Sequence, residues 1–264
     1  MMTPHQPSND DERRWRYRRQ TAFAAFGESG QQRLQKASVL IVGSGALGCS
    51  AANLLVRAGL GRLVLVDPDT VQIDNLHRQI LFDETDITRL KVEAAREKLL
   101  RADSRANIET HPIRFEPETA DKLLRGIDLL LDGTDHFVTR LAMNAAAIKH
   151  RLPMVTAGVL GAAGQAMTIL PGETPCLACL IDPEDRESLD RPSGMEETGI
   201  LAPVVQVMAA LEVMETMKIL GGRPDAVRHA LWSADLWRNK FQTIAFDHLP
   251  TGRCPVCGWG DVKR

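Results

Sequence analysis

Short apolar runs alternate along much of the chain with longer stretches in which apolar residues recur every three or four positions. The runs predict strands that are buried on both faces, and the longer stretches predict helices packed against them. Their alternation predicts a doubly wound, mostly parallel α/β sheet. The expected strands are Val39–Val42, Arg62–Val66, Ile108–Ile113, Ile127–Leu131 and Pro153–Ala157, and the expected helices are Ala46–Arg57, Ile87–Arg101, Ala120–Leu124 and Phe137–His150.

The pattern changes in the last third of the chain. A strand is expected over Gln165–Leu170, and the charged stretch Asp182–Glu197 contains Pro and Gly without periodicity, which predicts a mobile loop. Two further strands, Ala230–Ala234 and Phe241–Phe246, predict an antiparallel hairpin that extends the sheet.

The longest apolar stretch is Ile200–Leu220, and it is long enough to raise the question of a membrane span. It contains Glu212, Glu215 and Lys218, which follow one another at intervals of three residues. Side chains at that spacing share one face of a helix, so the stretch predicts a buried amphipathic helix instead of a membrane span.

Composition narrows the class of protein. The chain has 264 residues, 44% of them hydrophobic and 25% charged, with a net charge of −2, which is ordinary for a soluble enzyme. The small net charge argues against a nucleic-acid or membrane-surface protein, and the absence of a signal-like apolar run near Met1 predicts a cytoplasmic location. The basic segment Arg13–Gln20 is either a solvated helix face or a segment that reaches a phosphate.

A glycine-rich turn follows the first expected strand. Gly43, Gly45 and Gly48 have the spacing Gly-x-Gly-x-x-Gly between a strand and a helix, and this arrangement lets backbone N–H groups approach a phosphate at the helix N-terminus. The second strand ends at Asp67, 24 residues after Gly43, which is near the spacing of a ribose-binding acid. The sequence therefore predicts a Rossmann-like nucleotide site at the carboxyl edge of the sheet.

Four of the five cysteines form two Cys-x-x-Cys pairs, Cys176 with Cys179 and Cys254 with Cys257. Two such pairs supply four thiolates to a tetrahedral Zn²⁺ and leave no open position, which predicts a structural site. The alternatives are free thiols or a redox pair. The fifth, Cys49, is expected to be a small core residue.

These features give one continuous domain with three parts. Residues 1–12 are polar and are expected to be a disordered tail. Residues 13–170 form the nucleotide-binding core, and residues 171–264 supply the crossover loop, the long helix, the antiparallel strands and the zinc-binding C-terminus.

The ordered set of motifs resembles the ThiF/MoeB/HesA family, the bacterial relatives of ubiquitin-activating (E1-like) enzymes, over about Arg13 to Gly258. The resemblance is closest to the ThiF branch in Ala234–Asn239 and Cys254–Gly258. The motifs that carry it are Arg16–Gln20, the glycine turn, Asp67–Asp69, Asn75–Gln79, Lys91–Ala94, Asp132–Asp135 and both cysteine pairs.

The resemblance implies ATP- and Mg²⁺-dependent adenylation of the C-terminal glycine carboxylate of a small ubiquitin-like sulfur carrier that ends in Gly-Gly. Asp67 would bind the ribose, Asn75, Arg78 and Lys91 the phosphates, and Asp135 the Mg²⁺; Arg19 would reach the neighbouring subunit of a homodimer. The nucleotide-binding set that the resemblance assigns is Gly43, Gly45, Gly48, Asp67, Asp69, Asn75, Arg78, Lys91, Asp135 and Arg19, of which Asp135, Arg78 and Lys91 are expected to be catalytic. Taken singly, Asp135 is equally interpretable as a helix N-cap, and Arg78 and Lys91 as surface charges.

Two positions depart from the family pattern. His136 stands where members usually have Asn, and Met195 stands where ThiF and MoeB carry a loop cysteine. A thioether forms no thioester or persulfide, so this departure predicts that the reaction stops at the acyl-adenylate and that a separate protein donates the sulfur.

Three other functions are weighed against this one. An NAD-dependent oxidoreductase explains the glycine turn and Asp67, but not the set Asn75, Arg78, Lys91 and Asp135. A non-catalytic dimeric adaptor of the same fold would not need that set. The branch of the family that acts on tRNA is disfavoured by the lack of excess positive charge.

Overall fold

The computed structural model describes residues 9–181, 199–246 and 253–259. The tail predicted to be disordered comprises residues 1–12, and residues 1–8 lie outside the described part of the chain. Asn9–Glu12 belong instead to helix α1 (Asn9–Thr21), so the predicted boundary is wrong. The expected loop Asp182–Glu197 also lies outside the described residues.

One sheet of eight strands runs through the described chain in the order β3-β2-β1-β4-β5-β6-β7-β8. Neighbours from β3 to β5 pair in parallel, and the three pairings from β5 to β8 are antiparallel. The predicted α/β class with an antiparallel extension is therefore confirmed. The strands are β1 (Ser38–Val42), β2 (Arg62–Val66), β3 (Asn107–His111), β4 (Leu129–Asp132), β5 (Met154–Leu160), β6 (Ala163–Ile169), β7 (Ala230–Asp235) and β8 (Lys240–Ala245).

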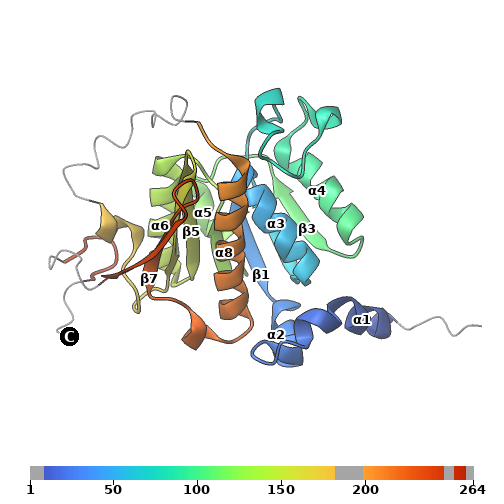
Figure 1. Ribbon diagram of the computed structural model, residues 1–264, viewed down its shortest axis with the longest axis horizontal. Helices are drawn as coiled ribbons and strands as arrows, with labels where there is room; N and C mark the ends of the chain where they lie inside the picture. The colour runs from blue at the N-terminus through green and yellow to red at the C-terminus, as the bar shows by residue number, and fades with distance from the viewer. Residues whose placement is uncertain (1–8, 182–198, 247–252, 260–264) are drawn as a thin grey trace, which may run out of the picture.

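Helices cover both faces of the sheet (Figure 1). One core cluster joins the odd residues of β1, such as Val39 and Ile41, to one group of helices, and the second joins Leu40 and Val42 to the other group. This alternation is why the central strands read as continuous apolar runs. The first group is α2 (Gly27–Leu34), α3 (Ala46–Ala58), α4 (Lys91–Ala102) and α8 (Ala202–Leu220), and the second is α5 (Pro117–Leu123) and α6 (Phe137–His150).

The strand order reverses between β1 and β4, because the chain builds outward from β1 in one direction and then from β4 in the other. Val42 pairs with Val66 of β2 on one side and with Asp132 of β4 on the other, so these three strands end at one level. Ligands of doubly wound sheets bind at such a switch point, beyond the carboxyl ends of the strands.

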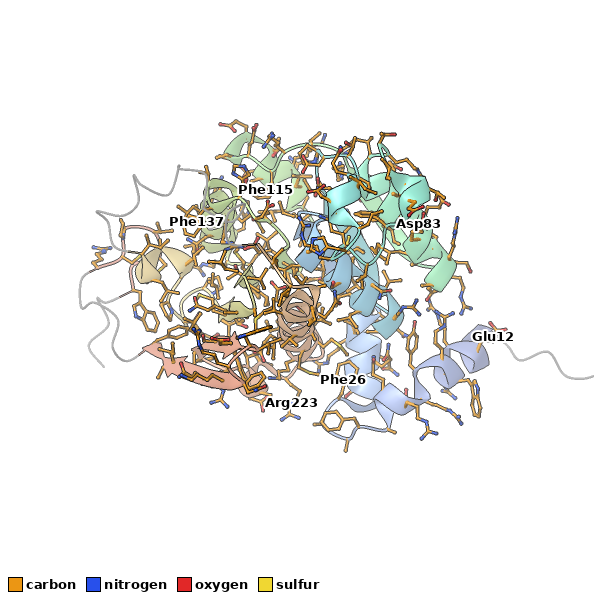
Figure 2. The ribbon with its side chains drawn as sticks, turned by 45° about the horizontal axis from the view of Figure 1, so that its top comes forward. Glu12, Phe26, Asp83, Phe115, Phe137 and Arg223 are labelled. Carbon is orange, nitrogen blue, oxygen red and sulfur yellow. The ribbon has the colours of Figure 1, made fainter. Side chains whose placement is uncertain are left out.

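The N-terminal helices lie at the opposite end of the sheet, near the lower edge of Figure 1. Gln20 Nε2 donates to the Ala58 carbonyl at 3.0 Å, which ties α1 to the last turn of α3. Arg223 Nη1 donates to the Ala25 carbonyl at 3.1 Å, and Figure 2 shows Arg223 close to Phe26, beyond the end of α8. Helix α2 is absent from the sequence prediction.

The three charged residues of helix α8 lie on one face, as predicted, and that face points toward the protein interior. Glu215 pairs with Lys218 at 2.5 Å and accepts the backbone N–H of Arg228 at 3.1 Å, while Glu212 is fully buried. The outward face is apolar instead, and Met214 is 54% exposed on it. Within the described part of the chain, none of the helices combines the length and the apolarity needed to cross a bilayer.

Helix α4 begins at Lys91, four residues after the predicted start. Thr88 has φ +74°, in the left-handed region, and its N–H donates to the Val71 carbonyl, so the chain turns sharply before the helix. Lys91 thus stands in the first turn of the helix and not along its side. Four short 3₁₀ turns complete the described elements: η1 (Ile73–Asn75), η2 (Glu84–Asp86), η3 (Leu177–Leu180) and η5 (Pro224–Ala226).

Candidate nucleotide site and metal centre

The glycine turn sits at the switch point between β1 and β4. Gly43 has φ +91°, and its N–H donates to the Val66 carbonyl at 2.7 Å. A Cβ on Gly48 would lie 1.8 Å from the Gly43 carbonyl oxygen, whereas one on Gly45 would meet no protein atom closer than 3.8 Å. Gly43 and Gly48 are therefore required by the fold itself, and the space beside Gly45 is left for a ligand.

Asp67 follows β2 and fixes the glycine turn from the side. Its Oδ2 accepts the Ser44 N–H at 2.6 Å and its Oδ1 accepts the Asp69 N–H at 2.8 Å. Burial raises the pKa of the Asp67 carboxyl, and the nearby Lys91 ammonium and these N–H donors offset part of that shift. The structure thus places the predicted ribose acid against the predicted phosphate turn.

The predicted phosphate-binding cations approach from the segment between β2 and α4. Lys91 is only 8% exposed and its Nζ lies 3.1 Å from Asp69 Oδ2. The buried Asn75 side chain accepts the Gln72 N–H at 3.2 Å, and Arg78 Nη1 donates to the Asp74 carbonyl at 2.7 Å. Each cation is held by an oxygen of the protein, and a phosphate oxygen would have to replace or join that partner.

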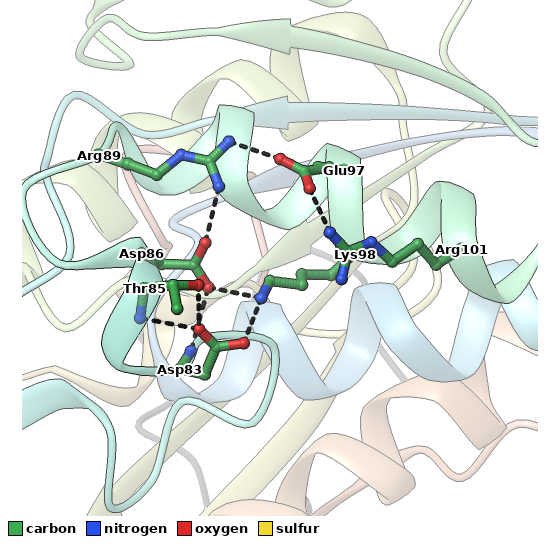
Figure 3. A network of polar contacts seen from close by, with 7 residues as sticks. All are labelled: Asp83, Thr85, Asp86, Arg89, Glu97, Lys98 and Arg101. Carbon is green, nitrogen blue, oxygen red and sulfur yellow. Dashed lines mark hydrogen bonds and ion pairs between the residues drawn. The ribbon is translucent and has the colours of Figure 1, made fainter.

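A polar network holds the chain just before Lys91 (Figure 3). Its centre is Asp86, which is fully buried and accepts Arg89 at 2.8 Å and Lys98 at 3.0 Å. Lys98 also contacts Asp83, and this hydrogen bond lowers the pKa of the Asp83 carboxyl to about 2. The network fixes the start of α4 and, with it, the position of Lys91.

The loop after β4 touches the glycine turn, because a Cβ on Gly43 would lie 2.6 Å from the Gly133 carbonyl group. Within this loop Asp132 is fully buried: Oδ1 accepts both the N–H and the hydroxyl of Thr134 at 2.9 Å. Asp135 is exposed, and its carboxylate has no hydrogen-bond or ion-pair partner among the residues that the structure describes. Asp132 therefore shapes the loop, and Asp135 is left available to a cation.

The position of Asp135 bears on its alternative interpretation as a helix cap. The N-cap of α6 is His136, and no side chain caps the helix there. His136, which departs from the family pattern, is exposed beside Asp135. The carboxylate is thus not used to start the helix.

Sequence reasoning gave no role to Ser44 and Gln79, although both lie inside the motifs that it singled out. Ser44 is 1% and Gln79 4% exposed, and within the described part of the chain Ser44 Oγ and Gln79 Oε1 have no hydrogen-bond partner. The Gln79 amide nitrogen lies 4.0 Å from where a Cβ on Gly45 would be. Buried polar atoms without partners are costly, so their presence beside an open glycine fits a polar ligand such as ATP.

Arg19 is predicted to contact the nucleotide of a neighbouring subunit, and the structure places it away from the nucleotide site of its own chain. It is exposed on α1, which is tied to the C-terminal end of α3, whereas the glycine turn is at the N-terminal end. The 13 residues of α3 separate the two by about 20 Å. Arg19 therefore cannot reach the nucleotide site of its own chain.

The four predicted metal ligands come together. The sulfur atoms of Cys176 and Cys179 are 3.9 Å apart, those of Cys176 and Cys254 are 3.9 Å apart, and those of Cys179 and Cys257 are 3.4 Å apart. Bonds of about 2.3 Å from a tetrahedral Zn²⁺ require sulfur separations of about 3.8 Å. All four sulfurs lie within 4.8 Å of one another, so the residues fit Zn²⁺.

The electrostatics of the cluster also favour a cation. Hydrogen bonding from the Cys179 thiol lowers the pKa of Cys176 to about 5, while the same contact raises the pKa of Cys179. Ionisation of one thiol thus makes ionisation of its neighbour less favourable. A bound divalent cation allows several thiols to lose their protons together. Cys49 is apart from this cluster: it is 1% exposed, and burial raises the pKa of its thiol.

Comparison with known proteins places the chain among close relatives. A model of the ThiF family matches residues 17–256. The sulfur carrier protein ThiS adenylyltransferase of Bacillus subtilis is 36% identical over 250 residues, which cover 93% of this chain and 72% of that protein. The sulfur carrier protein adenylyltransferase of Thermus thermophilus is 34% identical over 254 residues, which cover 94% of this chain and 92% of that protein.

Two further matches are a relative that is longer than this chain and a solved structure. Adenylyltransferase and sulfurtransferase MOCS3 of Anopheles gambiae is 36% identical over 244 residues, and the chain spans about half of its length, 54%. The crystal structure of E. coli MccB matches with a TM-score of 0.79 at 23% identity, covering 98% of this chain and 75% of that one. At this identity the likeness establishes the fold alone.

Proposed function

The chain belongs to the ThiF family, and from this premise we propose that it adenylates the C-terminal glycine carboxylate of a small ubiquitin-like sulfur carrier ending in Gly-Gly, with release of pyrophosphate. The relatives named above are adenylyltransferases, two of them of sulfur carriers. The proposal rests on one observation: at the switch point of the sheet, the open glycine turn meets the loop whose exposed Asp135 has no hydrogen-bond or ion-pair partner among the described residues.

The proposed reaction explains the residues around this point. A carboxylate oxygen of the carrier attacks the α-phosphorus of ATP, and the bond from that phosphorus to the pyrophosphate oxygen breaks. Both reactants are anionic, so cations must neutralise them. Lys91, whose charge acts on Asp67 beside the glycine turn, and Arg78, next to Gln79 at that turn, would supply these cations. Asp135 would hold Mg²⁺, which supplies charge neutralisation along the phosphates.

We further propose that the active protein is a homodimer in which Arg19 enters the site of the partner copy. Two observations support this. Arg19 is about 20 Å from the glycine turn of its own chain. The outer faces of α3 and α8, which lie side by side in Figure 1, also expose apolar side chains that a second copy would cover, with Leu54 at 38%, Leu201 at 48% and Met214 at 54%.

The sulfur is proposed to come from a separate donor protein. Met195, at the position of the family's loop cysteine, lies outside the described residues, and its thioether provides no thiol for transfer. Cys49 does not replace it, because its sulfur is buried and donates to the Ser44 carbonyl at 3.2 Å. The proposed product is therefore the carrier acyl-adenylate, as a step in sulfur incorporation for thiamine or molybdopterin-type cofactors.

Carrier-dependent ATP–pyrophosphate exchange tests the proposal. We expect exchange with carriers that end in Gly-Gly and none with the same carriers lacking the last glycine. Asp135→Ala and Arg78→Ala should fold normally and lose exchange, because neither side chain is buried in the core. Arg125→Ala, which removes an exposed arginine before the start of β4, at the opposite end of that strand from Asp135, is the matched control and should retain exchange. Full exchange in both site variants would refute the assignment.

A binding measurement distinguishes the proposed adenylyltransferase from an NAD-dependent oxidoreductase. ATP with Mg²⁺ should raise the melting temperature and NAD should not, since only a bound ligand stabilises the folded state. Stabilisation by NAD alone would favour the rival function.

A further inference from the structure

Asn144 is a polar residue in the middle of the apolar face of α6. Its side chain is 1% exposed and lies among Met143, Ala146 and Ala147, which belong to the core. Burying a side-chain amide is unfavourable unless its hydrogen bonds are made. The contacts of Asn144 therefore indicate why the helix carries it.

Both ends of the Asn144 amide contact the cysteine cluster. The backbone N–H of Leu177 donates to Asn144 Oδ1 at 2.9 Å, and Asn144 Nδ2 donates to Cys176 Sγ at 3.6 Å. Because a backbone N–H only donates, the atom that faces it must be the amide oxygen, and the NH₂ group is left to face the sulfur. Hydrogen bonds from such neighbours orient metal ligands and tune their electron density.

One turn earlier on the same face, Arg140 holds the loop of the nucleotide site. Its Nε lies 2.5 Å from Asp132 Oδ2, and its Nη2 donates to the carbonyls of Thr134 and Ala157, each at 2.8 Å. The two residues are four positions apart, so they project from α6 in nearly the same direction. The first turn of α6 is thus fixed to the nucleotide-site loop and its middle to the metal centre.

We propose that Asn144 is a positioning residue that couples the zinc centre to the loop carrying Asp135: the metal-bound Cys176 fixes Asn144, Asn144 fixes the position of α6, and α6 fixes Arg140 and the loop between Asp132 and Asp135. The link to catalysis rests on the proposed adenylation, but the link between the two sites does not. The zinc centre then supports the catalytic geometry as well as the fold.

The first test follows the metal ligand. In full-length protein with Co²⁺ in place of Zn²⁺, Asn144→Leu removes the hydrogen bond to Cys176, and the more electron-rich sulfur should shift the thiolate-to-cobalt charge-transfer band to longer wavelength. Zinc release to a chelator should be about tenfold faster or more. Asn53→Leu makes the same change on α3, where Asn53 Oδ1 accepts from Arg57 Nε at 2.8 Å, and should alter neither property.

The second test follows the loop without using activity. Hydrogen exchange of the zinc-loaded protein should lose protection in the peptide covering residues 132–140 in Asn144→Leu and keep it in Asn53→Leu. If Asn144→Leu does not fold, Asn144→Asp serves: it keeps an acceptor for Leu177, loses the N–H donor to sulfur and adds a negative charge near Cys176, which should shift the cobalt band in the same direction. An unchanged cobalt band or unchanged protection would overturn the coupling.

Activity then separates this inference from the proposed function. With zinc retained, the Asn144 variant should need more Mg²⁺ for half-maximal pyrophosphate exchange, because Asp135 is no longer held in place. If the unaltered protein shows no pyrophosphate exchange, the proposed function is refuted, and the hydrogen-exchange protection of residues 132–140 alone decides the coupling. Exchange with an unchanged Mg²⁺ requirement in the variant would refute the coupling alone.

Discussion

The Glu212→Gln variant should gain stability relative to the unaltered protein as pH rises. The Glu212 carboxyl, on the inward face of α8, is fully buried, and neither oxygen has a hydrogen-bond partner of normal geometry in the segments that the structure describes. Burial raises its pKa well above the ordinary value, and the nearby Asp132 raises it further, while Arg140 offsets only part of the shift. The folded protein therefore holds a proton on Glu212 that the unfolded chain releases.

The sign and size follow from proton linkage. An acid whose pKa is raised on folding contributes full stability below its unfolded-state pKa, about 4.3, and loses that contribution as pH rises toward the folded-state value. Each pH unit in this window lowers the free energy of unfolding by about 1.4 kcal/mol. Glutamine has nearly the same shape and no proton to lose, so the variant escapes this loss.

Urea unfolding of both proteins between pH 5 and pH 8 measures the effect. The difference in unfolding free energy should grow in favour of Glu212→Gln by about 1.4 kcal/mol per pH unit in the lower part of that range. The zinc centre also depends on pH, but it is common to both proteins and cancels. Glu215→Gln is the control: it loses the ion pair with Lys218, keeps one oxygen that can accept the Arg228 N–H, and should be destabilised. A difference that does not change with pH would refute the reasoning.

Five further substitutions probe the sites. Gly48→Ala should lower the free energy of unfolding by about 3 kcal/mol, because its Cβ would overlap the loop backbone; Gly45→Ala should change it by less than about 0.5 kcal/mol yet weaken ATP binding measured by calorimetry. Cys254→Ser should reduce bound zinc from about one per chain toward none in metal analysis, and normal zinc content would contradict the ligand assignment. Asp86→Asn should cost about 2 kcal/mol by urea unfolding, since Asp86 is buried between two cations, and Glu97→Gln, on the exposed side of the same network, less than about 1 kcal/mol.

The fold was predictable because its signals are local. Four apolar residues from Val39, the glycine turn and the acid Asp67 follow one another within about one βαβ unit, and the backbone needs of Gly43 and Gly48 leave few other residues possible there. The cysteine pairs were equally predictable, because the Cys-x-x-Cys spacing of metal ligands is visible in the sequence itself.

The residues that support these sites were not predictable from the sequence, because their contacts are with residues distant in the chain. Arg140 acts on Asp132 and Ala157, and Asn144 acts on a cysteine 32 residues away, so each has meaning only once the sheet has brought those partners together. The charges of α8 were located correctly in sequence, but which way they face depends on what covers the opposite side. Helix α2 lacks a distinct apolar repeat, since only Gly30, Gln31 and Leu34 are buried in it.

The proposed function depends on ATP binding where the glycine turn meets the loop carrying Asp135. A crystal structure of the protein with a non-hydrolysable ATP analogue and Mg²⁺ would decide this. We expect the triphosphate to lie between Lys91 and Arg78 with the metal on Asp135. A triphosphate bound away from these three side chains would contradict it.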